Sequence, residues 1–276
     1  MKILVTGANG YLGSGVVKRL CDDGFPVIAT DFKNDSIDSR ATVVLGDLFD
    51  MDDPFSALGK PDVLLHMAWR DGFVHNSPNH LIDLPRHALF LRKMISGGIK
   101  RIAVLGTMHE IGFVEGPIDE NTPCRPESYY GISKNALRQI TKLECDSSNV
   151  RFQWFRGFYI VGAMANGNSI FSKIVQAERR GDLTFPFTTG TNQFDFLDYD
   201  DFSNYLAKAV EQEKVLGVIN ICSGRPERLA DRVERFIKDN GFKIKLEYGK
   251  YPDRVYDSKA VWGDGKKIRQ KRTSRA

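Results

Sequence analysis

The stretch YYGISK, residues 129–134, places one tyrosine four residues before a lysine. Residues four apart share one face of a helix, so the Tyr130 phenol and the Lys134 ammonium are expected to project together. The pKa of a free phenol is about 10, and a neighbouring cation favours its ionised form. Tyr130 could therefore exchange a proton with a substrate oxygen near neutral pH. Tyr129 is five residues from Lys134, and we interpret it as a packing residue or a cleft wall.

A glycine-rich turn predicts a dinucleotide site near the start of the chain. In TGANGYLG, Gly7, Gly10 and Gly13 follow the apolar run KILVT and open a helical pattern. The first glycine permits a tight turn, the second lets the backbone approach a pyrophosphate, and the third lets the helix pack against the sheet. Asp31 ends the next apolar run, where a carboxylate binds the ribose hydroxyls of NAD and repels the 2′-phosphate of NADP. We therefore favour NAD(H) over NADP(H), although Asp31 could be an ordinary loop aspartate and Lys33 could soften the discrimination.

Apolar runs alternate with segments of helical periodicity along most of the chain. Strands are expected at 2–6, 26–31, 42–47, 61–68, 100–107 and 150–157, and helices at 11–24, 81–96 and about 127–146. Such alternation implies right-handed crossovers and a doubly wound parallel Rossmann sheet in an α/β protein. Further along, helices are expected at 169–181, 199–212 and 225–241, and strands at 194–198 and 217–224.

We divide the chain into three parts. Residues 1–157 are mainly an NAD-binding Rossmann domain. Residues 158–265 interleave a last sheet strand with a small substrate cap, and residues 266–276 form a basic tail that is expected to be mobile. A substrate cleft is expected between the first two parts, above the carboxyl ends of the strands.

Composition excludes several classes of function. The net charge is +4, but six basic residues lie in the tail, and without them 33 basic residues face 35 acidic ones. We therefore expect no nucleic-acid partner. The four cysteines are far apart and form no C-x-x-C pair, and the five histidines lack ligand spacing, so reduced thiols and no metal are expected. Because no signal peptide or long apolar span is present, we expect a soluble cytoplasmic protein without a membrane partner.

The order of the motifs carries a family resemblance. The glycine pattern, Asp31, GDLFD, LLHMAW, LGT, YYGISK and DFLDYDDF together resemble the extended short-chain dehydrogenase/reductase family, over about residues 2–265. These are nucleotide-sugar epimerases, dehydratases and ketoreductases on a Rossmann fold, also called the NAD-dependent epimerase/dehydratase family. The resemblance implies that Thr107 joins Tyr130 and Lys134 as a catalytic residue that orients the reacting oxygen, and that Lys134 also holds the nicotinamide ribose. The alternative for Thr107 is a threonine that caps a strand end.

The predicted cofactor site combines these motifs. Asp47 and Leu48 of GDLFD are placed where an adenine edge and face could be bound. The full set of expected cofactor contacts is Gly7, Asn9, Gly10, Tyr11, Leu12, Gly13, Asp31, Phe32, Asp47, Leu48, Met67, Ala68, Tyr130 and Lys134.

Departures from the family pattern bear on the reaction. Met108 and His109 occupy the places where dehydratase relatives carry acids, which argues against a dehydratase. His109 could be a second acid or base, or a structural histidine. DLPRH, residues 83–87, stands for the usual asparagine-rich helix start, and Phe194 stands where relatives carry an arginine. The candidate substrate contacts are His109, Asn168, Ser169, Gln193, Arg225 and Arg254.

The resulting functional prediction is an NAD(H)-dependent oxidoreductase or epimerase of a nucleotide-linked sugar. Reduction of a 4-keto-6-deoxy sugar nucleotide is the first choice. The alternatives are a nucleotide-sugar 4-epimerase, a dehydrogenase that oxidises a free aldose or uronic acid at C1, and a non-catalytic NAD(P)-binding redox sensor. Redox sensors of this fold tend to lose the tyrosine and lysine, which are both present. The family resemblance also implies a homodimer built on two helices beside the sheet.

Overall fold

Seven parallel strands form the central sheet, and the computed structural model describes residues 1–162, 169–253 and 258–269 of the chain. From edge to edge the strands are β11 (Gly217–Ile221), β7 (Arg151–Gly157), β5 (Arg101–Thr107), β4 (Val63–His66), β1 (Ile3–Thr6), β2 (Val27–Asp31) and β3 (Thr42–Leu45). Every neighbouring pair is parallel. The chain winds outward from β1 in one direction and then from β4 in the other, which confirms the predicted doubly wound Rossmann sheet.

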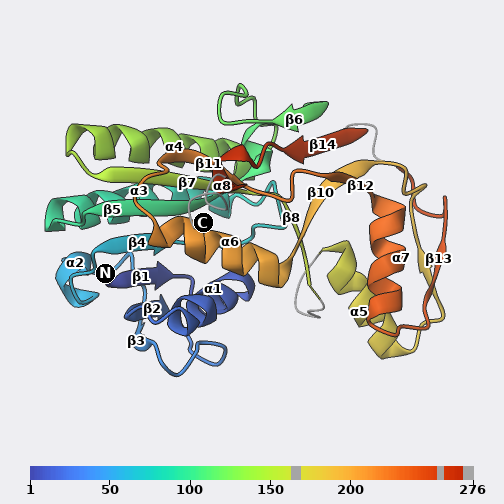
Figure 1. Cartoon of the computed structure of the whole chain (residues 1–276), viewed down its shortest axis with the longest axis horizontal. Helices are drawn as coiled ribbons and strands as arrows, with labels where there is room; N and C mark the ends of the chain where they lie inside the picture. Colours follow the sequence, from blue (N-terminus) through green and yellow to red (C-terminus); the bar gives the residue numbers. More distant parts are fainter. Residues whose placement is uncertain (163–168, 254–257, 270–276) are drawn as a thin grey trace, which may run out of the picture.

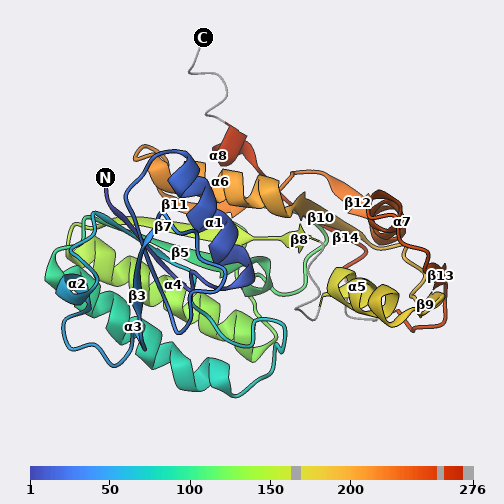
Figure 2. The same cartoon turned by 90° about the horizontal axis from the view of Figure 1, so that it is seen from below.

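Helices cover both faces of this sheet, as Figure 2 shows. One face carries α1 (Tyr11–Asp22) and α6 (Tyr199–Glu211), and the other carries α3 (Asn79–Gly97) and α4 (Tyr129–Ser147), with the short α2 (Pro54–Ala57) beside α3. Strand side chains alternate between the two layers. Ile3 and Val5 pack in the core under α1 and α6, whereas Leu4 packs in the core under α3 and α4. Burial on both faces explains why the central strands β1, β4 and β5 are continuous apolar runs.

A second, smaller sheet, formed by five strands of the described residues, lies beside the central one (Figure 1). It orders β12 (Pro226–Arg228), β10 (Gln193–Asp198), β14 (Ala260–Gly263) and β6 (Gly116–Ile118), with β8 (Tyr159–Val161) beside β10. Helices α5 (Ile170–Arg180) and α7 (Leu229–Asp239) and the pair β9 (Thr184–Pro186) and β13 (Lys245–Glu247) complete this part. Figure 1 shows α5, α7 and β13 together at one end of the molecule.

A buried carboxylate joins the two sheets. Asp195 of β10 is fully buried and accepts hydrogen bonds from Ser223 and Gly224, which follow β11, and from Gly263 of β14. Burial raises the pKa of Asp195, and these hydrogen bonds oppose the rise. One side chain thus satisfies several backbone N–H groups at the junction.

One prediction about local structure was wrong. The helix predicted over 225–241 begins only at Leu229, because residues 226–228 pair antiparallel with the start of β10. The described part of the basic tail, residues 266–269, forms a short helix, α8 (Lys266–Arg269). There the Lys267 ammonium donates to the Val218 carbonyl and pairs with Glu120, 3.1 Å away, which holds α8 on the edge of the sheet. Among the described residues, no helix is long and apolar enough to cross a membrane.

Candidate active site

The three predicted catalytic residues come together at the carboxyl end of β5. Thr107 is the last residue of β5, and Tyr130 and Lys134 lie in the first two turns of α4. The Ser128 hydroxyl caps this helix by accepting a hydrogen bond from the Gly131 N–H. A hydrogen bond joins the Thr107 hydroxyl and the Tyr130 phenol, and the Lys134 ammonium donates to the Leu105 carbonyl of β5 over 2.8 Å. Tyr129, by contrast, projects largely into solvent.

Lys134 is a buried cation. Its side chain is 3% exposed, and its ammonium lies 4.0 Å above the centre of the Trp69 ring. Burial lowers the pKa of Lys134 to about 7, and the Glu110 carboxylate opposes the change. Trp69 is itself held in place, because its ring stacks on His87 and its indole N–H donates to His80. A cation over an indole face is stabilised electrostatically.

The pKa of Tyr130 departs from the prediction. Lys134 was expected to favour the phenolate, yet burial raises the pKa of Tyr130 to about 12. The hydrogen bond from Thr107 opposes this rise, and the negative charge of Glu110 adds to it. Desolvation of the phenolate therefore outweighs the lysine in the protein alone.

All five histidines of the chain lie around Trp69 and Tyr130. The His75 ring stacks on the Tyr130 ring with 5.4 Å between their centroids. The centroid of the His109 ring lies 4.3 Å from that of His75. Burial lowers the pKa of His109 to about 3, so its imidazole is neutral at pH 7. His109 also donates its backbone N–H to the Thr107 hydroxyl. These contacts place His109 beside the three predicted catalytic residues, and its role as a second acid or base or as a structural histidine stays a prediction.

A chain of hydrogen bonds fixes two of these imidazoles. Thr6 accepts two backbone N–H bonds at its hydroxyl, from Met67 and Ala68, so its own proton points to His66 Nδ1, 2.8 Å away. His66 then carries its proton on Nε2 and donates to His87 Nδ1 over 2.8 Å. Burial lowers the pKa of His66 to about 3 and that of His87 well below its usual value. Both rings are therefore neutral neighbours of Lys134.

The glycine turn has the shape of a dinucleotide cradle. Gly7 has φ +67°, and a Cβ there would lie 2.7 Å from the Ala68 nitrogen, while a Cβ on Gly13 would overlap the Gly7 carbonyl. Gly10 is the N-cap of α1 and provides no side-chain hydrogen bond, which leaves the first N–H groups of the helix open to a phosphate. The Asp31 carboxylate lies beside this turn, because it accepts the Asn9 N–H over 2.9 Å. The residues present fit a bound dinucleotide.

The other predicted cofactor contacts vary in exposure. Leu48 and Met67 are buried, whereas Phe32 is exposed. The Asp47 carboxylate already pairs with Arg86 over 3.0 Å and accepts the Phe49 N–H. Tyr11 stacks on Tyr199, whose hydroxyl donates to the Tyr11 carbonyl, and Leu12 is partly buried.

The predicted substrate contacts are more scattered. Asn168 and Arg254 lie outside the described residues. Ser169 caps α5 by accepting the Ser172 N–H, Gln193 is the exposed first residue of β10, and Arg225 is exposed in the turn before β12. Phe194, which stands in place of the family's arginine, is buried against Tyr159 with 4.7 Å between ring centroids. The aromatic residue therefore serves the core of the second part.

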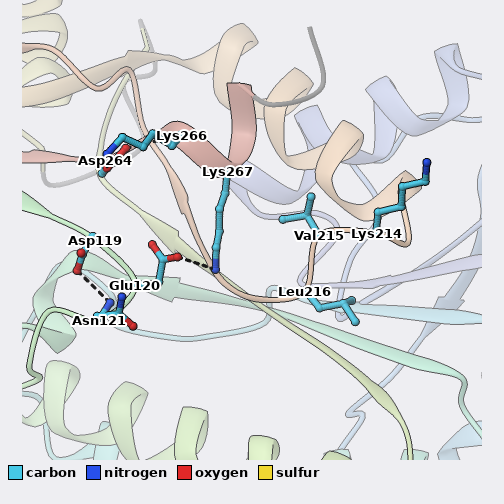
Figure 3. Close-up of a pocket in the computed structure, with 9 residues that line it drawn as sticks. All are labelled: Asp119, Glu120, Asn121, Lys214, Val215, Leu216, Asp264, Lys266 and Lys267. Atoms are coloured by element: carbon cyan, nitrogen blue, oxygen red, sulfur yellow. Dashed lines mark hydrogen bonds and ion pairs between the residues drawn. The ribbon is translucent and has the colours of Figure 1, made fainter. Parts of the chain in front are cut away.

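A groove of about 520 Å³ lies away from the catalytic residues (Figure 3). It is open at the amino end of β11, whereas Thr107 marks the carboxyl end of β5 in the same parallel sheet. The Lys267–Glu120 pair spans part of it. Its lining residues are Asp119, Glu120, Asn121, Lys214, Val215, Leu216, Asp264, Lys266 and Lys267. This groove is therefore not the cleft that the sequence predicted.

Sequence reasoning missed two residues that shape the site. The Trp69 ring makes a cation–π contact with the Lys134 ammonium. The buried Glu110 accepts a hydrogen bond from the Thr107 N–H over 2.8 Å. The pattern Thr107-x-x-Glu110 is a capping box and could have been noticed. Nothing in the sequence around Trp69 indicates its contact with a lysine 65 positions later.

Fold and site together define a class of protein. A doubly wound parallel sheet, a glycine turn, an acid at the end of β2 and a Thr-Tyr-Lys group at the end of β5 are the features of a Rossmann-fold oxidoreductase that uses a nicotinamide dinucleotide. The chain belongs to the NAD dependent epimerase/dehydratase family, because the sequence model of that family matches residues 3–222. It is therefore an NAD-dependent enzyme. Both the predicted family and the predicted cofactor are confirmed, and the redox-sensor alternative is set aside.

Known proteins of this kind resemble the chain over most of its length. A dTDP-6-deoxy-L-talose 4-dehydrogenase (NAD(+)) of Aggregatibacter actinomycetemcomitans is 42% identical over 269 residues, covering 95% of this chain and 99% of that protein. A GDP-6-deoxy-D-talose 4-dehydrogenase of the same organism is 24% identical and covers 81% of this chain and 75% of that one. The crystal structure of a Thermotoga maritima UDP-glucose 4-epimerase with UDP-glucose matches with a TM-score of 0.83 and 22% identity, covering 98% of this chain and 92% of that one.

The pKa of Lys134 predicts a pH-dependent stability. Between pH 7 and 10.5 the folded protein holds fewer protons on this group than the unfolded chain, so its contribution to the free energy of unfolding rises with pH. Below pH 7 the cost of burying the ammonium is present in full. Lys134→Met removes this cost, so its melting temperature should exceed that of the wild type most at pH 6–7, and the excess should shrink toward pH 10.

Thermal melts of both proteins between pH 6 and 10 measure this difference. The exposed Lys250 offers a matched control, because Lys250→Met should give a difference that does not vary with pH. If the melting-temperature difference between Lys134→Met and the wild type is also independent of pH, the pKa of Lys134 is not lowered in the folded protein.

Proposed function

We propose that the enzyme interconverts a 6-deoxyhexose nucleotide and its 4-keto form, with NAD(H) as the redox partner and dTDP as the nucleotide. The observation that carries the proposal is the 42% identity, over 95% of the chain, to a dTDP-6-deoxy-L-talose 4-dehydrogenase. The Thr107–Tyr130–Lys134 arrangement supports it, because a hydroxyl–phenol pair beside a buried ammonium can bind and protonate a sugar oxygen.

Thr107, Tyr130 and Lys134 have different roles at the reacting C4 oxygen of the sugar. NAD(H), when bound, would supply or accept the hydride at C4 of the sugar. Thr107 and Tyr130 hydrogen-bond the C4 oxygen, and Tyr130 gives this oxygen a proton during reduction and takes it back during oxidation. Lys134, on the same helix face, binds the nicotinamide ribose and stabilises the phenolate that reduction leaves behind. In the reduction, C4 would gain the hydride from NADH and the C4 oxygen would gain the proton from Tyr130, which gives the alcohol.

The remaining roles follow from position. The open N–H groups of α1 and the glycine turn hold the pyrophosphate of NAD, and Asp31 binds the adenosine ribose and disfavours NADP. Loss of water from the sugar is disfavoured, because Met108 is buried and offers no acid where dehydratases place one. The only acid nearby in this turn, Glu110, faces Trp154 in the interior rather than the phenol side of Thr107.

A panel of substrates tests the reaction. Reduced nicotinamide absorbance is followed with a dTDP-4-keto-6-deoxyhexose, the parent dTDP-hexose and a free uronic acid. We expect stoichiometric loss of NADH with the keto sugar alone. Interconversion of two dTDP-hexoses without a net signal would make the enzyme an epimerase, and reduction of NAD by the uronic acid alone would make it a C1 dehydrogenase.

The two adjacent tyrosines provide a matched test of the proton donor. Tyr130→Phe removes only the hydroxyl, so NADH affinity should stay nearly constant while kcat falls about 100-fold or more, as expected for a lost acid–base group. Tyr129→Phe makes the same change on an exposed ring and should leave kcat unchanged. Equal kcat values for the two variants would remove Tyr130 from the mechanism.

We further infer that the enzyme is a homodimer through α3 and α4. Four exposed apolar side chains follow one face of α4, and Leu81, Ile82 and Leu89 are exposed on the neighbouring α3. The four on α4 are Tyr129, Ile132, Ile140 and Leu143, whose spacing is helical. A contiguous apolar surface of this kind is typical of an interface between two copies of a chain.

Sedimentation measures this association. Leu143→Glu places a charge on the α4 surface, so the dimer should dissociate to a monomer at micromolar concentration because the carboxylate would be desolvated there. Leu183→Glu is the matched control, since Leu183 is as exposed but lies before β9, outside α3 and α4. A dimer that tolerates Leu143→Glu and dissociates with Leu183→Glu would place the interface elsewhere.

A further inference from the structure

Glu110 is a fully buried acid directly behind the candidate active site. It ends the 3₁₀ turn η1 (Met108–Glu110), which Thr107 begins. The Thr107 hydroxyl accepts the His109 N–H, and Glu110 Oε1 accepts the Thr107 N–H over 2.8 Å. This reciprocal capping box ties the carboxylate to the backbone of the residue that hydrogen-bonds the Tyr130 phenol.

The carboxylate of Glu110 is held firmly on its other side. The Trp154 indole N–H lies 2.9 and 3.0 Å from its two oxygens, and the Arg156 and Arg138 guanidinium groups lie 3.6 and 3.9 Å from Oε2. Trp154 and Arg156 belong to β7, the neighbour of β5. A glycine precedes Thr107 for the same reason, since a Cβ on Gly106 would overlap Trp154 and lie 2.5 Å from Glu110 Oε1.

A buried charge at this place needs an explanation beyond stability. Removing a carboxylate from water is costly, and an apolar side chain could fill the same space. Arg156 is the nearest buried positive charge, and the buried ammonium of Lys134, which donates to Leu105 of β5, is a second one. Opposite charges lower the cost of burying one another.

We propose that Glu110 is a positioning residue of the active site, whose carboxylate orients Thr107 toward the Tyr130 phenol and serves as the counter-charge of the Lys134 ammonium. The inference rests on the proposed roles of Thr107, Tyr130 and Lys134. Its electrostatic part rests on placement, because Lys134 donates to the Leu105 carbonyl and Glu110 accepts from the Thr107 N–H two residues later on the same strand. The carboxylate accordingly raises the pKa of Lys134 against the effect of burial. The ionisable groups around Lys134 are Tyr130 on α4, Glu110 on η1, His66 on β4 and His87 on α3. Arg138 on α4 and Arg156 on β7 face the Glu110 carboxylate.

Two substitutions separate the effect of the negative charge of Glu110 from the effect of its side-chain length. Glu110→Gln keeps the length of the side chain and removes the charge, whereas Glu110→Asp keeps the charge and withdraws it from the Thr107 N–H. Lysine labelled with ¹³C at Cε allows the Lys134 pKa to be followed by NMR from pH 5 to 9, with its signal identified by its absence in Lys134→Met. This readout needs no sugar, so it stands even if the proposed substrate is wrong.

In Glu110→Gln we expect the titration of Lys134 to move on the order of one pH unit lower, because an opposite charge is lost. In Glu110→Asp the titration should stay in place. With the keto sugar, both variants should lose about 10–100-fold in kcat through misplacement of Thr107, with the dissociation constant of NADH changed less than about threefold. The exposed Glu127 is the matched control, and Glu127→Gln should leave the titration and kcat unchanged.

Several outcomes would overturn the inference. An unchanged Lys134 titration in Glu110→Gln removes the counter-charge, and a wild-type kcat in Glu110→Asp removes the positioning of Thr107. If Glu110→Gln does not fold, Glu110→Asp alone decides, since a kcat equal to that of the wild type then refutes the proposal. If wild-type protein turns over none of the sugars, the proposed function fails while the NMR titration still judges Glu110.

Discussion

The burial of one ammonium group governs the arrangement of the active site. Lys134 is removed from water, so its charge must be compensated within the protein. The compensation comes from the Leu105 carbonyl on β5, the ring of Trp69 after β4 and the carboxylate of Glu110 on η1. These groups meet because β4 and β5 are neighbours in a parallel sheet whose carboxyl ends share one edge. The same helix that carries Lys134 carries Tyr130 one turn earlier, so fixing the lysine also fixes the phenol.

Three histidines near this cation supply hydrogen bonds without adding charge. His66 and His87 are kept neutral by burial and are linked to Thr6, while His80 accepts from Trp69. A charged imidazole in their place would repel the ammonium and add to the cost of its burial. His66, His80 and His87 therefore act as rigid polar supports of the site.

The smaller sheet is attached to the larger one through polar contacts at a buried junction. Asp195 binds the turn after β11 and the backbone of β14, so segments far apart in the chain meet at one carboxylate. The segments beyond the family match, which ends at residue 222, supply β12, α7 and β14 of this part. Phe194, which stands in place of the family's arginine, fills the aromatic core there through its contacts with Tyr159 and Phe196.

Local patterns in the sequence were enough to predict the sheet, the glycine turn and the place of Tyr130 and Lys134 at the start of one helix. Each depends on spacing along one strand, turn or helix, where covalent geometry decides which side chains share a face. The tertiary structure decided what spacing does not contain. Residues 226–228 became a strand because β10 lay beside them, and Trp69 met Lys134 because β4 lay beside β5. The pKa values of Tyr130 and Lys134 depend on desolvation and on the charge of Glu110, which are properties of the folded interior rather than of neighbouring residues in the chain.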